Sequence, residues 1–270
     1  MLPQYLQDNL DRIQKSEQEK FKITQSFRKF EKPVIQNIIK DHLDGNESYI
    51  GREDVLEYFK RNDDYTGFFA VMVWGGISTG GMTGDNLTSL LRLHSSVIEN
   101  IVKDLREQLS DDKVGEAFQY MDSGKGKLKG LGESYFTKLF FFIAAAEGAT
   151  TIPPIFDKWT KFAFCALLID LGECNKAKRY ISSITDFLPH IRTAHKVEAY
   201  KDFVELMNQW ARECGTSVDK LETFIFGKHR GKYRTTENSR NYFDEYINTH
   251  CKTALGFSHN KIKTNTNTGC

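Results

Sequence analysis

The stretch that decides the fold is Lys125-Gly-Lys-Leu-Lys-Gly-Leu-Gly-Glu-Ser-Tyr-Phe-Thr-Lys-Leu-Phe-Phe-Phe-Ile143. Gly130 and Gly132 predict a tight turn between two helices, because glycine adopts positive φ and lets another backbone approach closely. The amides of Gly132, Glu133 and Ser134 then begin a helix, whose unpaired N–H groups and dipole favour an anion. Further positive charge comes from Lys125, Lys127 and Lys129. The stretch therefore predicts a phosphodiester-binding hairpin, and an ordinary helix–turn–helix with solvated lysines is the alternative.

The composition around this stretch is that of a globular protein. The 270 residues are 40% hydrophobic and 27% charged, which allows one large domain or two smaller ones with a sizeable core. The longest apolar runs, 139–146 and 162–169, are far shorter than the roughly 20 residues of a membrane helix. The first 20 residues contain no apolar segment of the kind that a secretory signal needs. We expect a cytoplasmic protein with no membrane contact.

The cysteines argue against disulfides and metal clusters. Their number is odd, their spacings are wide and no CxxC motif occurs, which favours a reducing cytoplasm. The set consists of Cys165, Cys174, Cys214, Cys251 and Cys270. We expect no cofactor and no metal, and burial of Cys165, with Cys174 as a second candidate, as small apolar side chains.

The charge is balanced overall but uneven along the chain. Lys and Arg number 37 against 36 Asp and Glu, for a net charge of +1. Residues 228–270 hold eight Lys or Arg and three acids, so this tail is basic. A basic tail is compatible with a polyanionic partner, and a merely solvated tail is the alternative.

Helical periodicity runs through almost the whole chain, and no strand-like alternation persists. The sequence predicts helices at 5–22, 33–45, 52–74 with an interruption near Gly67, 86–109, 114–121, 134–146, 157–171, 176–187, 194–214 and 218–226. The five glycines of 75–86 predict a loop, and the pattern decays beyond Gly227. His94 falls on an apolar stripe and is interpreted as a core histidine. The fold class is therefore all-α.

Two further side chains are candidates for chemistry. Asp157 follows Pro153 and Pro154 at the point where a helix begins, so it is interpreted as an N-cap carboxylate that stays anionic even near nucleic acid. Lys138 lies one turn into an otherwise apolar helix, where partial desolvation would lower the pKa of its amine and make it nucleophilic. Alternatively, Lys138 extends to the helix surface and Asp157 is only a cap.

Together these residues resemble the helix–hairpin–helix DNA glycosylases, and within them the branch similar to 8-oxoguanine DNA glycosylases. The resemblance rests on the glycine hairpin, on a lysine in the following helix, and on a helix-capping aspartate after a proline turn nineteen residues later. The triplet Phe136-Thr137-Lys138 is similar to that of archaeal 8-oxoguanine glycosylases. The resemblance covers residues 50–227.

The resemblance implies two helical lobes with a cleft between them, and a division into an N-terminal helical extension (1–50), a glycosylase-like domain (51–227) and a basic tail (228–270). It implies a monomer that binds double-stranded DNA, flips out a damaged base and excises it through a Schiff base, with strand scission as a following step. Lys138 would be the nucleophile and Asp157 would stabilise the cationic sugar. The hairpin contacts to DNA would come from Lys125, Lys127, Lys129, Gly130, Gly132 and Ser134.

The substrate base stays open at this level. Oxidised guanine is favoured by the resemblance, and a bulky modified base of foreign DNA, excised in defence, is an alternative. A DNA-binding helical protein without catalysis is another alternative, as is an unrelated helical interaction protein. The aromatic candidates for a base pocket are Trp74, Phe136, Trp159 and Trp210, each of which has core packing as its competing role.

Overall fold

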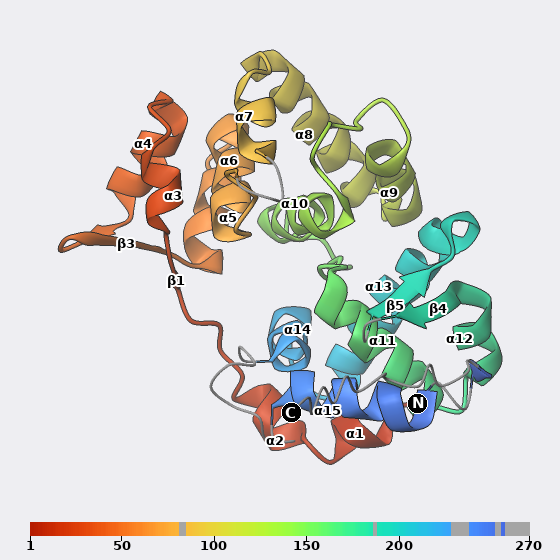
Figure 1. Cartoon of the computed structure of the whole chain (residues 1–270). Helices are drawn as coiled ribbons and strands as arrows, with labels where there is room; N and C mark the ends of the chain where they lie inside the picture. The colour runs from red at the N-terminus through yellow and green to blue at the C-terminus, as the bar shows by residue number, and fades with distance from the viewer. Residues whose placement is uncertain (81–84, 186–187, 228–237, 252–254, 257–270) are drawn as a thin grey trace, which may run out of the picture.

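Helices dominate the computed structural model, which describes residues 1–80, 85–185, 188–227, 238–251 and 255–256. Figure 1 shows these helices in an upper and a lower group. The upper group contains α3 (Gln25–Arg28), α4 (Pro33–Asp41), α5 (Arg52–Lys60), α6 (Asp64–Trp74), α7 (Asn86–Leu91), α8 (Ser95–Ser110), α9 (Val114–Asp122) and α10 (Glu133–Ala146). The predicted all-α class is confirmed, whereas the predicted cleft between two lobes stays a prediction.

The lower group combines the two ends of the described chain (Figure 1). It contains α1 (Gln4–Gln7), α2 (Leu10–Gln14), α11 (Lys158–Asp170), α12 (Cys174–Tyr180), α13 (Lys196–Glu213), α14 (Val218–Phe226) and α15 (Ser239–Tyr246). A 3-10 turn precedes α13 at Thr193–His195, and a π-helical turn follows α15 at Ile247–Cys251. Tyr5 of α1 stacks on Tyr242 of α15 with ring centroids 3.8 Å apart. The division of the chain into units 1–50, 51–227 and 228–270 stays a prediction.

Two small antiparallel sheets correct the expectation of a strand-free chain. One has the order β1-β3-β2, formed by β1 (Phe21–Lys22), β2 (Leu43–Asp44) and β3 (Glu47–Ile50). The other is the hairpin of β4 (Ile181–Thr185) and β5 (Leu188–Ile191). The predicted helix 176–187 was therefore wrong over Ile181–Thr185, where the β-branched Ile181, Ile184 and Thr185 favour a strand, and residues 186–187 lie outside the described part of the chain. The predicted helix 5–22 is two short helices and β1.

The helix predicted over 52–74 is two helices, and its break lies elsewhere than expected. α5 ends at Lys60, and Asn62 adopts a positive φ of 58°. Asp63 then caps α6 by accepting a hydrogen bond from the Thr66 amide. Gly67, predicted as the interruption, lies inside α6, where a Cβ would be 3.0 Å from the Phe59 ring. This glycine lets the two helices pack closely.

The helix predicted over 86–109 is also divided, at His94. The His94 side chain is exposed and accepts a hydrogen bond from the Ser96 amide, so it caps α8. Its interpretation as a core histidine was wrong, because capping satisfies an amide that the helix itself leaves unpaired. By contrast, α9, α10, α11 and α14 confirm their predicted ranges to within about two residues. Cys165 is buried as expected, and Cys214 is buried as well.

Candidate active site

The connection between α9 and α10 is the hairpin that the glycines predict. Gly130 has a φ of +86°, and a Cβ there would lie 2.7 Å from the Asn86 carboxamide oxygen. Gly132 is the exposed N-cap residue of α10, and no side chain among the described residues caps it. A Cβ at Gly132 would meet no described atom within 4 Å. The start of α10 is thus open to a ligand, as an anion site requires.

The charged residues of the hairpin lie where the sequence places them. The side chains of Lys125, Lys127 and Lys129 are exposed, and Ser134 in the first turn of α10 is half-buried. Exposed ammonium groups beside an uncapped helix start produce a local positive potential. The arrangement suits a phosphate backbone, and contact with DNA stays a prediction.

Lys138 is buried on α10, with 8% of its surface exposed. Its Nζ donates to the Ser134 carbonyl oxygen at 2.7 Å and lies 5.2 Å from the centre of the Tyr135 ring. The stem packs against Gly75, where a Cβ would come within 2.9 Å of Lys138 Cδ. A side chain at residue 75 would therefore compete with the lysine for space. The expectation of a desolvated lysine agrees with this burial.

The electrostatics of Lys138 favour the neutral amine. Burial lowers the pKa of Lys138, and the carboxylates of Asp157 and Glu222 partly oppose this effect. The Arg52 guanidinium lowers the pKa of Lys138 further. Lys138 forms no ion pair among the residues that the structure describes. A lysine of this kind provides a nucleophilic lone pair at a pH where an exposed lysine is protonated.

Asp157 is the N-cap of α11, as the sequence predicts. Its Oδ1 accepts hydrogen bonds from the Trp159 amide at 2.8 Å and from the Thr160 amide at 3.1 Å. In return, the Asp157 amide donates to Thr160 Oγ1 at 2.9 Å, which completes a capping box. The carboxylate is therefore held in one orientation against the first turn of α11.

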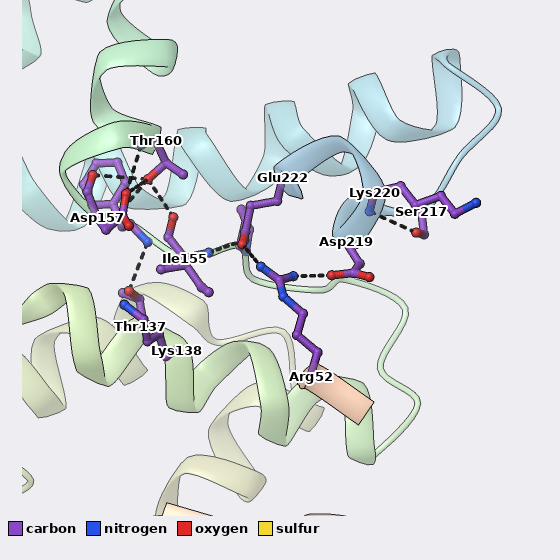
Figure 2. A network of polar contacts seen from close by, with 12 residues as sticks. Arg52, Thr137, Lys138, Ile155, Asp157, Thr160, Ser217, Asp219, Lys220 and Glu222 are labelled. Atoms are coloured by element: carbon purple, nitrogen blue, oxygen red, sulfur yellow. Dashed lines mark hydrogen bonds and ion pairs between the residues drawn. The ribbon is translucent and has the colours of Figure 1, made fainter. Parts of the chain in front are cut away.

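The turn before Asp157 is held by side chains from other helices (Figure 2). The Ile155 amide donates to Glu222 of α14 at 2.6 Å, and the Phe156 amide donates to Thr137 Oγ1 of α10 at 3.0 Å. Glu222 is 1% exposed and also pairs with Arg52 of α5, which pairs in turn with Asp219. Burial raises the pKa of Glu222 and the Arg52 guanidinium opposes that shift.

The sequence alone did not single out Arg52 or Glu222, and Thr137 was named only within the triplet 136–138. Arg52 and Glu222 are 170 positions apart, and Thr137 is separated from its partner by 19. A carboxylate at 222 among apolar neighbours of α14 was the available signal, because an unpaired buried charge is costly and implies a partner. The partner itself depends on tertiary packing.

Two of the four aromatic candidates lie near the candidate catalytic residues. Trp74 directly precedes Gly75 and packs on Phe142, and its buried Nε1 has no hydrogen-bond partner among the described residues. Trp159 is half-buried beside Asp157, with the Arg240 guanidinium 4.6 Å from its ring centre. Their role in a base pocket stays a prediction.

The other two aromatic candidates lie in the core. Phe136 is 1% exposed and packs between Phe118 and Phe140. Trp210 of α13 is fully buried, and its Nε1 donates to the Met1 carbonyl oxygen. The structure gives both rings a packing role and does not bring Trp210 to Lys138.

The described residues contain no group of three or more His, Cys, Asp or Glu side chains arranged to hold a metal ion. Within the same residues, no helix combines the length and apolarity that crossing a membrane would require.

The mostly helical fold and the glycine hairpin between α9 and α10 are those expected of the helix–hairpin–helix class, and the catalytic roles of Lys138 and Asp157 stay a prediction. The chain matches a protein family over residues 17–226, more than half of its length, and it belongs to that family: "Putative 8-oxoguanine DNA glycosylase OGG-like protein". No curated protein and no solved structure matches the chain. The family membership confirms the resemblance seen in the sequence and indicates a DNA glycosylase-like function.

Proposed function

We propose that the protein is a bifunctional DNA glycosylase that excises a damaged base, with oxidised guanine as the favoured substrate. The observation that carries the proposal is the buried amine of Lys138 beside the capped carboxylate of Asp157. Family membership supports the glycosylase class, and its description favours oxidised guanine. The lyase step rests on the amine alone.

The chemistry requires a neutral amine and a fixed carboxylate. The lone pair of Lys138 Nζ attacks C1′ of the flipped nucleotide, and the glycosidic bond breaks with its electrons leaving on the base. The departing base takes up a proton. Asp157 stabilises the cationic charge that develops on the sugar, and it accepts a proton from the alkylated amine. Proton transfer to O4′ opens the sugar ring and gives a Schiff base, and loss of a proton from C2′ then expels the 3′ phosphate and breaks the strand.

Borohydride trapping is the experiment that tests this function. The wild-type chain is incubated with duplexes that carry one modified base each, among them 8-oxoguanine, alkylated purines and bulky adducts. A covalent adduct with one duplex identifies both the Schiff base and the substrate. Base release without an adduct would support a glycosylase that uses water. Binding without release would support a non-catalytic DNA-binding protein.

The hairpin is tested by Gly132→Asp. A side chain fits at Gly132, so the variant should fold, while its carboxylate blocks the amides of α10 and repels phosphate. We expect affinity for every duplex to fall by about tenfold and the salt dependence to weaken. Gly130→Asp is the contrasting variant, because positive φ and the nearby Asn86 side chain should make it unfold the hairpin. Unchanged affinity of Gly132→Asp would remove the hairpin from the DNA interface.

A further inference from the structure

The turn that leads into Asp157 is fixed by an uncommon set of contacts. Pro153 and Pro154 have no amide hydrogen, so the donors of the turn are the amides of residues 155, 156 and 157. Each of the three donates to a side chain, and the three side chains come from different helices: Glu222 of α14, Thr137 of α10 and Thr160 of α11. Figure 2 shows these contacts around the turn.

The three contacts differ in what they connect. Thr160 lies in α11, so it ties Asp157 to the helix that Asp157 itself caps. Glu222 ties the turn to α14. Only the Thr137 contact among these three ties the turn to α10, the helix that carries Lys138. It joins the residue next to Lys138 to the residue next to Asp157.

In its contact with the turn, the Thr137 hydroxyl is the hydrogen-bond acceptor. Thr137 is fully buried, and its Oγ1 donates its hydrogen to the Glu133 carbonyl oxygen at 2.6 Å. Its lone pairs then accept from the Phe156 amide at 3.0 Å. Because the hydroxyl is anchored within its own helix, it holds the Phe156 amide at a fixed place relative to α10.

We propose that Thr137 is a positioning residue that sets the Asp157 carboxylate relative to the Lys138 amine during base excision. The inference rests on the proposed function, since it assigns a role within that reaction. Displacement of a reacting group by about 1 Å can cost on the order of a hundredfold in rate. A hydrogen bond between the neighbours of both groups is placed to prevent such a displacement.

The test compares Thr137→Val with Thr137→Ser. Valine keeps the shape and removes the acceptor, whereas serine keeps the hydroxyl and removes a methyl group. Ser48→Ala is the control for lost stability, because Ser48 is fully buried and its Oγ donates to Ile39 O at 2.9 Å in the upper group. For each protein we would measure the melting temperature, duplex affinity and the single-turnover excision rate on the duplex that the wild type traps.

We expect Thr137→Val to excise at least about tenfold more slowly than the wild type at unchanged affinity. Thr137→Ser should stay within about threefold of the wild type, and Ser48→Ala should lose stability without losing rate. If Thr137→Val does not fold, Thr137→Ala replaces it, since the smaller side chain leaves room for water at the Phe156 amide.

A pH profile separates positioning from lost stability. The charged groups that act on Lys138 are Asp157 and Glu222, which raise its pKa, and Arg52, which lowers it. If Asp157 moves away in Thr137→Val, the pKa of Lys138 falls further and the acid limb of the rate profile moves to lower pH. A smaller folded fraction would lower the rate at every pH by the same factor and would not move the acid limb.

Two results would overturn the inference: a Thr137→Val rate and acid limb equal to those of the wild type, or equal impairment of the valine and serine variants. Both presuppose an active wild type. A wild type that excises no base from any duplex would contradict the proposed function instead, so the two failures are distinguishable.

Discussion

Lys138 and Lys161 are equally buried lysines on consecutive helices, each 8% exposed, and the protein holds them in opposite ways. Lys161 forms an ion pair with Glu133 at the start of α10, with its Nζ 5.0 Å from the centre of the Phe156 ring. Lys138 contacts a carbonyl oxygen, and the carboxylates that influence it act without an ion pair among the described residues. An ion pair compensates the charge of Lys161, whereas burial lowers the pKa of Lys138.

The difference shows how one site can contain a structural and a reactive lysine. Ion pairing offsets the cost of burial for Lys161, and the same pair connects α10 to α11. Lys138 has a carbonyl oxygen as its hydrogen-bond partner, and the charges of Asp157 and Glu222 offset its burial only in part. Burial alone would therefore not have distinguished the two residues, whereas their partners do.

The largest expected effect is on Schiff base formation. Lys138→Gln retains most of the stem but has no nucleophilic amine, so excision and borohydride trapping should both vanish while duplex binding survives. The matched variant Lys161→Gln should still be trapped, at a rate within about threefold of the wild type after correction for folded fraction. Gel analysis of the trapped adduct measures both. An adduct with Lys138→Gln would show that another amine is the nucleophile.

The second effect concerns the carboxylate that acts on Lys138 from the α11 cap. Asp157→Asn should slow excision about 100-fold or more, because the charge matters mainly in the transition state. Its melting temperature should hardly change, since Asn caps helices about as well as Asp. Single-turnover kinetics and thermal unfolding separate the two roles. Full activity in this variant would leave Asp157 as a cap alone.

Local signals in the sequence were sufficient to predict the core of this site. The glycines at 130 and 132 predicted the hairpin, and prolines followed by Asp157 predicted the start of α11. Each signal acts over a few residues, where sterics and capping dominate. The apolar run after Lys138 left a desolvated amine and a surface amine as alternatives, and the structure has the buried one.

The supporting contacts could not be predicted in the same way. Arg52 and Glu222 look ordinary in their own helices, and the motif that contains Thr137 does not reveal its contact, because these roles arise from partners brought together by folding. The helix breaks at Asn62 and His94 were missed because apolar spacing continues across both. Apolar periodicity shows which face of a helix is buried. It does not detect a single residue whose backbone leaves the helical conformation.

The third effect is a shift in the pH profile caused by a more distant carboxylate. Glu222→Gln removes a negative charge that raises the pKa of Lys138, so that pKa should fall further. The acid limb of the excision rate should then move to lower pH, while the rate at pH 7 changes by less than about tenfold. The Gln carbonyl can still accept from the Ile155 amide.

Asp219→Asn is the control for this shift. Asp219 pairs with the same guanidinium, but its side chain is 46% exposed and it is not among the groups that act on Lys138. Both variants weaken the ion pairs of Arg52, and only Glu222→Gln should move the acid limb of the rate profile. A limb that stays in place in Glu222→Gln would show that Lys138 does not experience the Glu222 charge.

The smallest effects are on stability, and they should have opposite signs at the two lysines. Lys161→Met removes one ion-pair partner of Glu133. Its remaining ion-pair partner among the described residues is Lys196, at 3.7 Å. We therefore expect the free energy of unfolding to fall by about 1–3 kcal/mol. Lys138→Met replaces a buried amine that has no ion pair in that part of the chain with an apolar side chain of similar length. The free energy of unfolding should therefore rise by about 1 kcal/mol. Denaturant unfolding measures both.

The pH dependence of the Lys138→Met gain tests its cause. The pKa of Lys138 lies below the ordinary value of 10.5, so the unfolded chain binds more protons than the folded one between the two values. The stability of the wild type therefore rises with pH across that window, relative to Lys138→Met, which lacks the group. The advantage of the variant should be present at pH 7 and should shrink as the pH approaches 10.5. An advantage that persists at high pH would come from packing, and a loss of stability at pH 7 would mean that the folded protein stabilises the charged form of Lys138.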